Sequence, residues 1–533
     1  MMSHGSAALA LLRGLAAAAG LFVVAAADAA FALDTALARG PLPAQVVGDD
    51  TQAALEEGRE LFRRSRAGDF IDQFQNERFE VFAQPRQLQL FDDEGRFEDV
   101  FLDGDAAFEF EADRIMGAGF VAAENTDLLP TAPAPIHDGD RGGADGASCR
   151  GCHFAGGPDG AGSSTQRAFF RGDGRRLSSA VVRDAPHVMG LGYIARIARE
   201  MEAELLVTLT EAEDVAATTN ISVVLPLVAK GVSFGDLVAV PGGIVDRSRV
   251  EGVSPDLIIR PFGRKGRHAE LTGVVDEALQ LHHGLQSASR VREFLGSRDV
   301  LGEGPASDPD NDGVVASQIL QDDQPGAETS FAQAVLLASY LSLLGVPEIH
   351  PPRRADLLVS WTQGRQLLDD VGCTICHVEK QLMRSDVVEV KARAGYDLTL
   401  TFSLAEVGQQ PRPRRTDDGL ENERGGETPI FPYTDLKRHD LGAAVAEAGD
   451  EELPDGVDVI RGAVWLTRSL WGLADSAPYM PDGRANTVHE AILLHGGEAA
   501  GMRDAYLALS DLEQAALRVF LLSLTRSAVV LVE

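Results

Sequence analysis

"GASCRGCHFAGG" at residues 146–157 decides the fold, because it places two cysteines three positions apart with a histidine directly after the second. "VGCTICHVEK" at residues 371–380 repeats the arrangement, and the two stretches hold all four cysteines of the chain. C-x-x-C-H is the attachment signature of c-type haem. Two thiols form thioethers with the haem vinyl groups while the histidine binds iron, so the three side chains must share one short helical turn.

The motifs therefore predict two covalently bound haem c groups, one for each motif. Haem 1 would be held by Cys149, Cys152 and His153, and haem 2 by Cys373, Cys376 and His377. A zinc site is the first alternative, but it needs four ligands at close spacing, and the two pairs are far apart in sequence. A disulfide or a thioredoxin-like redox pair gives no role to the histidine, and the latter also needs a βαβ context.

The N-terminus has the layout of a cleaved secretory signal over residues 1–32. Arg13 precedes an apolar run, Leu15–Ala27, and small residues follow at Ala30 and Ala32. We expect cleavage after Ala32, with Ala29 as second choice, and export to the periplasm. An uncleaved N-terminal anchor is the alternative. No later stretch reaches the ~20 apolar residues of a membrane span. The mature chain is thus predicted to have no membrane span.

The formal net charge of -33 argues against nucleic acid or an anionic membrane as a partner. It favours an exported protein, or a docking partner with a basic face. The sequence predicts no oligomeric state.

We expect a mainly α chain with two cytochrome c-like helical haem domains and small β insertions. The predicted N-terminal haem domain covers 33–345 and the C-terminal one 357–533, with a linker at 346–356. "EGRELF" at 57–62 resembles "QGRQLL" at 363–368, which is a weak sign of an internal repeat.

Helical patterns cover 190–206, 270–286, 330–345, 357–373 and, behind a Ser510 cap, the C-terminal segment. Residues 221–262 read as short strands or hairpins, and 405–458 as an extended loop packed round the haem domain.

Three further stretches, together with both haem motifs, resemble a known family. They are "FGRKGRHAELTGVVDEALQLHHGLQS" (262–287), "FPYTDLKRHDLG" (431–442) and "VWLTRSLWGLADSAPYMPDGRANTVHEAILLHGGEA" (464–499). The chain resembles the bacterial di-haem cytochrome c peroxidase superfamily, in its di-haem oxidoreductase (thiol oxidoreductase-like) branch. The resemblance covers residues 140–533 and leaves 41–135 unmatched.

The resemblance implies that haem 1 is the reactive centre and haem 2 an electron relay. His495 in "LLHGGEA" matches the position of the family's distal ligand to haem 2, with Met480 and Met502 as local alternatives. The sequence departs from the family at Pro481, where peroxidases carry histidine. It departs again at Leu466, where the branch often has arginine. Both changes place ordinary peroxidase activity in question, whereas Asp482 and Arg484 are retained and could serve haem propionates or the interface.

Peroxide cleavage at haem 1 needs a group that moves a proton near an open iron position. His282 and Gln286 share a helix face at i, i+4 spacing, and His187 in "DAPHVMGLG" is a third catalytic candidate. Met189 and His268 lie near these positions in sequence. Each histidine could equally be structural.

"DPDNDGVV" at 308–315 resembles the first half of a calcium loop. Asp308, Asp310 and Asp312 precede Gly313, but Ile319 stands where the closing glutamate should be. An acidic surface turn is the alternative to a calcium site.

The first functional hypothesis is an exported, peroxidase-like di-haem c-type oxidoreductase that relays electrons via haem 2 to an oxidant at haem 1. Its partners would be an electron-transfer protein and a small-molecule oxidant. One alternative is a non-catalytic electron-transfer cytochrome with both irons six-coordinate. Another is a di-haem oxygenase, similar to the rubber-cleaving relatives. Any of the three tryptophans, Trp361, Trp465 and Trp471, could lie on an electron path.

Overall fold

The computed structural model describes the second of the two units into which the chain divides, residues 1–74 and 75–533. The described residues are 96–111, 136–139, 145–163, 166–173, 176–285, 331–393, 398–404, 427–453 and 456–526, with single positions 287, 289, 329, 395 and 396. The predicted signal, Gln286 and the three aspartates of the candidate calcium loop, Asp308, Asp310 and Asp312, lie outside them.

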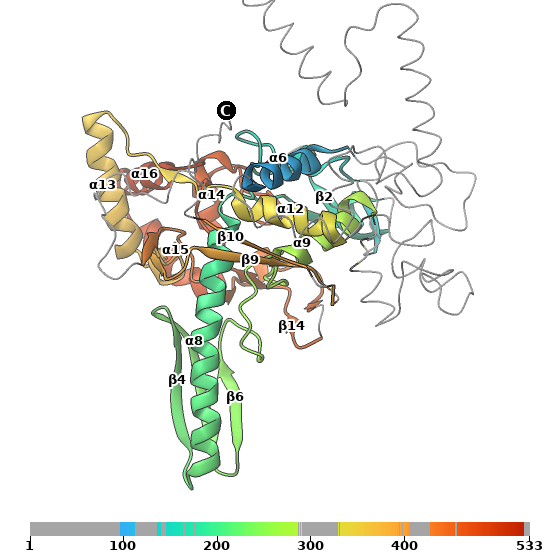
Figure 1. The fold of residues 1–533 in the computed structure, drawn as a ribbon. Helices are drawn as coiled ribbons and strands as arrows, with labels where there is room; N and C mark the ends of the chain where they lie inside the picture. The colour runs from blue at the N-terminus through green and yellow to red at the C-terminus, as the bar shows by residue number, and fades with distance from the viewer. Residues whose placement is uncertain are drawn as a thin grey trace, which may run out of the picture. The chain divides into compact units, whose positions relative to one another are not determined.

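The first described elements precede and follow the first cysteine motif along the chain, and α6 and β2 are labelled in Figure 1. They are α6 (Arg96–Glu109), β1 (Ile136–Gly139), α7 (Cys149–Cys152), β2 (Ala168–Asp173), η4 (Leu177–Ser179) and β3 (Val181–Arg183). The strands form one sheet in the order β1-β2-β3, parallel between β1 and β2 and antiparallel between β2 and β3. Helix α6 packs on α12 (Phe331–Leu343), where the rings of Phe101 and Phe108 lie 5.2 and 5.5 Å from the Tyr340 ring.

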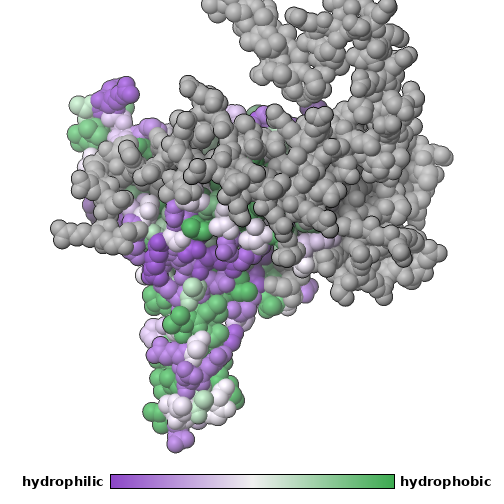
Figure 2. Space-filling view, in the orientation of Figure 1, coloured by the Kyte–Doolittle hydropathy of each residue, from purple (hydrophilic) through white to green (hydrophobic). Residues whose placement is uncertain are grey.

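A long helix and an antiparallel sheet follow the first motif. Helix α8 (Leu191–Thr218) runs beside β4 (Val223–Ala229), β5 (Val232–Val240) and β6 (Ile244–Val250), as Figure 1 shows. Side chains alternate along β4 between exposed and buried, as in a half-buried strand, so the predicted hairpins are confirmed. The exposed members include Val224 and Val228, and hydrophobic surface is visible along this part in Figure 2.

The helix predicted over 270–286 changes its period near its end. Helix α9 (Leu271–Ala278) continues directly into a π-helical turn, η5 (Leu279–His283). Such π turns are rare and occur frequently at functional sites. The turn carries both histidines of the "LHH" sequence, so it sets where they point.

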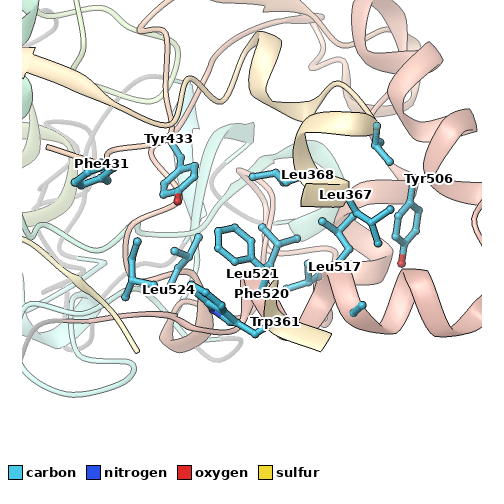
Figure 3. Packing of buried hydrophobic residues seen from close by; sticks show 14 residues of the cluster. Trp361, Leu367, Leu368, Phe431, Tyr433, Tyr506, Leu517, Phe520, Leu521 and Leu524 are labelled. Atoms are coloured by element: carbon cyan, nitrogen blue, oxygen red, sulfur yellow. The ribbon is translucent and has the colours of Figure 1, made fainter. Parts of the chain in front are cut away.

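Two helices build the core behind the second motif. Helices α13 (Ala355–Asp370) and α16 (Asp511–Leu521) cross closely, and Trp361 packs against Phe520 with ring centroids 5.7 Å apart (Figure 3). Trp361 Nε1 donates to Ser523 Oγ at 2.7 Å. Helix α16 begins behind a capping box in which Ser510 and Glu513 exchange side-chain to backbone bonds, so the predicted Ser510 cap is confirmed.

Between these helices the chain forms short strands and turns. The strands are β8 (Gln381–Met383), β9 (Val387–Lys391), β10 (Thr399–Ser403), β11 (Thr428–Ile430), β12 (Arg438–Asp440), β13 (Glu451–Glu452), β14 (Val459–Ile460) and β15 (Val464–Leu466). They pair as β8–β11, β9–β10, β12–β15 and β13–β14. The remaining elements are η6 (Cys373–Ile375), η7 (Ala443–Val445), η8 (Leu473–Asp475), α14 (Val488–Leu493), η9 (Gly497–Ala499) and α15 (Ala500–Ala508).

The mainly α prediction therefore holds only in part, because the described residues mix helices with several sheets of two or three strands. The predicted loop at 405–458 contains short strands where it is described. Strands of two to five residues leave little periodicity in the sequence, since distant partners decide whether they form. Within the predicted linker, β7 (Glu348–Ile349) pairs with β16 (Leu524–Thr525) near the C-terminus.

An ion-pair network joins the segment before α9 to the region of η7 and β13. Arg264 contacts Glu447 and Glu451, and Arg267 reaches both Glu451 and Glu277. His268 Nε2 lies 2.5 Å from Glu277 Oε2. Burial raises the pKa of Glu277, but the hydrogen bond from His268 and the nearby cations hold it well below its usual range. The network therefore depends on an ionised Glu277.

Among the described residues, no helix combines the length and the hydropathy needed to cross a bilayer.

Candidate functional site

The first cysteine motif forms one short helical turn, as thioether attachment requires. In α7 the Ser148 side chain accepts from Gly151 N, and His153 N donates to Cys149 O at 3.1 Å. His153 Nδ1 donates to the carbonyl of Pro186 at 2.8 Å. This bond fixes the ring and leaves Nε2 as the nitrogen free to bind a metal. Burial lowers the pKa of His153 to about 4, so the ring is neutral and can act as a ligand.

The π turn brings two histidines to this motif. Asp145 N and Gly146 N both donate to His282 O, so η5 and the residues before Cys149 are held together. His283 Nδ1 donates to Gly146 O at 2.7 Å, and its Nε2 lies 3.7 Å from Cys149 Sγ. His282 is a candidate catalytic residue in the sequence analysis, whereas His283 is not. The only signal for His283 in the sequence is its place next to His282.

His282 has the properties of a proton donor. Its Nδ1 lies 3.2 Å from both carboxylate oxygens of Asp145. Burial lowers the pKa of His282, but the charge and hydrogen bond of Asp145 outweigh it, and the net pKa is raised. His282 and His283 are thus held beside the first motif by the backbone bonds from Asp145 and Gly146 and by the 3.7 Å contact between His283 Nε2 and Cys149 Sγ.

His187 lies at the same site but is engaged by the backbone. Its Nδ1 accepts from Met189 N at 3.3 Å, and its ring lies against Gly472, where an added Cβ would be 3.5 Å from His187 Cδ2. Burial lowers the pKa of His187 to about 4. The neighbour Pro186 is the residue whose carbonyl holds His153, so His187 connects the first motif to the Trp471 segment.

The turn containing Pro481 also meets the first motif's domain. Asp184 N donates to Pro481 O at 2.8 Å, and an Arg167 guanidinium nitrogen donates to Gly483 O at 2.7 Å. Arg484 pairs with Asp482 at 2.5 Å, so both retained charges are already partnered with each other. The turn thus lies against Arg167 and Asp184.

The second motif is held in the same way as the first. Helix α13 ends at Asp370, the motif follows in η6, and His377 N donates to Cys373 O at 2.9 Å. His377 Nδ1 donates to the carbonyl of Tyr433 at 3.0 Å, which again leaves Nε2 free for a metal. Burial lowers the pKa of His377 to about 4.

His495 faces His377 at a separation that suits one iron between the two rings. The ring centroids lie 6.5 Å apart. Two imidazoles on opposite sides of an iron, each at about 2 Å from it, have centroids roughly 6 Å apart. His495 Nδ1 donates to Ala491 O at 2.8 Å, so Nε2 is again the free nitrogen. The donor set therefore fits a bis-histidine haem.

The two methionine alternatives have other surroundings. Met502 lies beside Gly372 and packs against the core cluster of α13 and α16. Met480 sits in a turn with a φ of 74°, between the bridge partners Tyr479 and Ala485. The His377 ring is faced instead by the His495 ring.

A cluster beside the second motif was missed by sequence reasoning. His439 Nε2 lies 2.8 Å from Asp435 Oδ2, and its Nδ1 lies 2.7 Å from Glu498 Oε2. Burial lowers the pKa of His439, but hydrogen bonds to Asp435, Cys376 and Glu498 raise it to about 11. The Cys376, Asp435 and His439 atoms could also bind a metal ion, yet both His439 nitrogens already bond carboxylates. The only sequence signal was their presence in the quoted stretches 431–442 and 464–499.

The four cysteines are partly buried. Burial raises the pKa of Cys149 to about 12 and those of Cys152 and Cys373 to about 11. Burial thus favours the protonated form of these three thiols when nothing is bound to them. Covalent attachment of haem does not require an ionised cysteine in the folded protein.

Comparison with known proteins supports the resemblance for the C-terminal segment. The model of the family described as "Di-haem oxidoreductase, putative peroxidase" matches residues 423–524, which include Tyr433, His439 and His495. No curated protein matches the sequence. Among solved structures, Kuenenia stuttgartiensis hydrazine synthase is similar over 37% of this chain, with 16% identity and a TM-score of 0.21. The chain spans 57% of the length of that protein.

Proposed function

Because residues 423–524 match the di-haem oxidoreductase family, we propose that the chain is an exported, peroxidase-like di-haem c-type oxidoreductase. It takes up electrons at the Cys373–His377 site and delivers them to an oxidant at the Cys149–His153 site. The observation that carries the proposal is the facing pair His377 and His495, at 6.5 Å between ring centroids. Haem iron, when bound at these sites, supplies the one-electron chemistry that the protein side chains lack.

A series of covalent bonds, hydrogen bonds and one ring contact connects the two proximal histidines and supports electron transfer between them. His377 donates to Tyr433 O, and the preceding residue, Pro432, accepts from Leu470 N at 3.1 Å. Trp471 and Gly472 follow Leu470, and the His187 ring lies against Gly472, where an added Cβ would be 3.5 Å from His187 Cδ2. His187 follows Pro186, which accepts from His153. Of the three tryptophans, Trp471 is therefore the one on this path.

At the reactive site, His282 donates the proton. Asp145 raises its pKa and orients its ring through Nδ1, which leaves Nε2 to give a proton to an oxidant. His283 holds the adjacent backbone and lies against Cys149, so it positions the attachment turn. Export to the periplasm is proposed from the N-terminal pattern of residues 1–32.

Stopped-flow absorption of the fully reduced protein mixed with hydrogen peroxide tests the function. We expect both haems to be oxidised as peroxide is consumed. Two low-spin irons that do not react with peroxide would replace the proposal with a non-catalytic carrier. A stable dioxygen complex without peroxide turnover would replace it with an oxygenase.

The His187→Phe variant tests the path, because it replaces the polar ring that lies against the backbone at Trp471 and Gly472. The expected result is roughly tenfold slower oxidation of haem 2 with unchanged oxidation of haem 1, about 1.4 kcal/mol in barrier. His489→Phe is the matched control, since His489 bonds the Tyr506 hydroxyl at 2.8 Å and lies off the path. If His187→Phe slowed haem 1 instead, His187 would be catalytic and the path would be wrong.

A further inference from the structure

We infer that His439 and Glu498 are positioning residues that fix the loop carrying His495, and thereby hold the distal imidazole opposite His377. This inference rests on the proposed function, because it concerns the ligation of haem 2. It adds a role for two residues outside the attachment motifs and their ligands.

One segment, 431–442, holds both sides of the haem 2 site. Near its start the Tyr433 carbonyl accepts from His377, and Thr434 N donates to Val378 O at 3.1 Å. Tyr433 itself has a φ of 53°, a left-handed conformation that costs a non-glycine residue energy and is commonly found at functional sites. Near the end of the same segment, His439 and Asp440 reach the loop that follows His495.

The contact to that loop is made by one carboxylate at two points. Glu498 Oε2 accepts from His439 Nδ1 at 2.7 Å, and Glu498 Oε1 accepts from Asp440 N at 2.9 Å. His439 is anchored on its other side by Asp435, whose side chain is 2% exposed. A carboxylate that accepts hydrogen bonds through both oxygens has a defined orientation. These bonds therefore fix the position of Glu498, which lies three residues after His495.

The two glycines between His495 and Glu498 let the loop come close enough for this contact. Gly497 has a φ of 52°, and a Cβ there would lie 2.1 Å from the Asp440 carbonyl oxygen. A Cβ at Gly496 would lie 2.8 Å from Leu441 O. The backbone of 440–441 therefore occupies the space that side chains would need, and the "HGGE" sequence is what this close packing requires.

We call the two bonds from Glu498 to His439 Nδ1 and to Asp440 N the clamp. Glu498 can be replaced without leaving an unpaired carboxylate buried. The Glu498 side chain is 56% exposed, and both residues line a cleft of about 540 Å³. Water can therefore replace the Glu498 carboxylate, and loss of the clamp from that side should release the loop rather than unfold the core. His439→Gln retains an amide donor for the buried Asp435 carboxylate. The residue affected by release of the loop is His495, whose ring Nδ1 donates to Ala491 O on the preceding helix α14.

Electron paramagnetic resonance and absorption spectra of the ferric holoprotein test the inference. In Glu498→Ala and in His439→Gln we expect loss of at least about half of the low-spin signal of haem 2, with a matching high-spin signal. Added imidazole should restore the low-spin signal, because the iron and its proximal ligand remain in place. Glu513→Ala is the matched control: it removes a carboxylate from the capping box of α16, and should leave the spectrum unchanged.

His495→Ala separates this inference from the proposed function. If His495→Ala abolishes the low-spin signal while Glu498→Ala and His439→Gln retain it in full, the bis-histidine site stands and the clamp is refuted. If Glu513→Ala loses the signal as well, general destabilisation explains the effect and the clamp is also refuted. If His495→Ala keeps the signal, both the ligation and the clamp are wrong.

Discussion

Replacing Gly364 by alanine should loosen the helix pair that supports the second haem motif. Gly364 lies on α13 where it crosses α16, and an added Cβ would be 2.0 Å from the Ala516 carbonyl oxygen and 3.0 Å from Leu517 Cα. An ordinary contact begins at 3.4 Å, so the helices must separate by roughly 1.4 Å at that point. Trp361, one turn earlier on α13, would then lose contact with Phe520 and its bond to Ser523.

The magnitude follows from two opposing terms. Overpacking against backbone costs up to about 3 kcal/mol, and the change from glycine to alanine in a helix returns about 1 kcal/mol. We expect a net loss of about 2 kcal/mol in the free energy of unfolding, measured by urea titration with circular dichroism. Gly501→Ala is the control, because nothing lies within 4 Å of its Cβ position on α15.

Gly501→Ala should gain about 0.5–1 kcal/mol. A Gly364→Ala variant as stable as the wild type, beside a stabilised Gly501→Ala, would refute the close crossing of α13 and α16.

Three further predictions concern single interactions. Glu277→Gln should lower the free energy of unfolding by about 2 kcal/mol at pH 7, because the lowered pKa of Glu277 makes its ionised form stabilising above the usual glutamate pKa near 4.5. In urea titrations the difference in stability between variant and wild type should shrink as pH falls below 4.5. A difference that stays constant with pH would contradict the assignment. Ser510→Ala removes the cap of α16 and should cost about 1 kcal/mol in the same assay, with no change in haem spectra. Trp361→Phe loses one buried hydrogen bond and should cost about 1–2 kcal/mol, whereas an unchanged midpoint would show that Ser523 finds another partner.

The attachment motifs were predictable because their chemistry is local. Thioether formation needs both cysteines and the histidine on one turn, so the spacing of Cys149, Cys152 and His153 carries the prediction in the sequence itself. The Ser510 cap and the hairpins at 223–250 were predictable for the same reason, since capping and alternation are read within a few residues.

The remaining site residues were out of reach because their roles come from contacts between distant segments. His495 was placed opposite His377 only through resemblance, and nothing in its own surroundings in the sequence marks it as a ligand. His439 gains its partners only when β12 lies against the loop at 496–498. The short strands between 381 and 466 were missed on the same grounds. The paired glycines before Glu498 were the one local signal of close packing.

The most direct test of the account is the number of covalently bound haems, measured by intact-mass spectrometry under denaturing conditions. The account predicts two haem additions on the wild-type chain, and one on each of the double variants Cys149→Ser/Cys152→Ser and Cys373→Ser/Cys376→Ser. A wild-type chain that carries no covalent haem, or a single one that survives in either double variant, would contradict it.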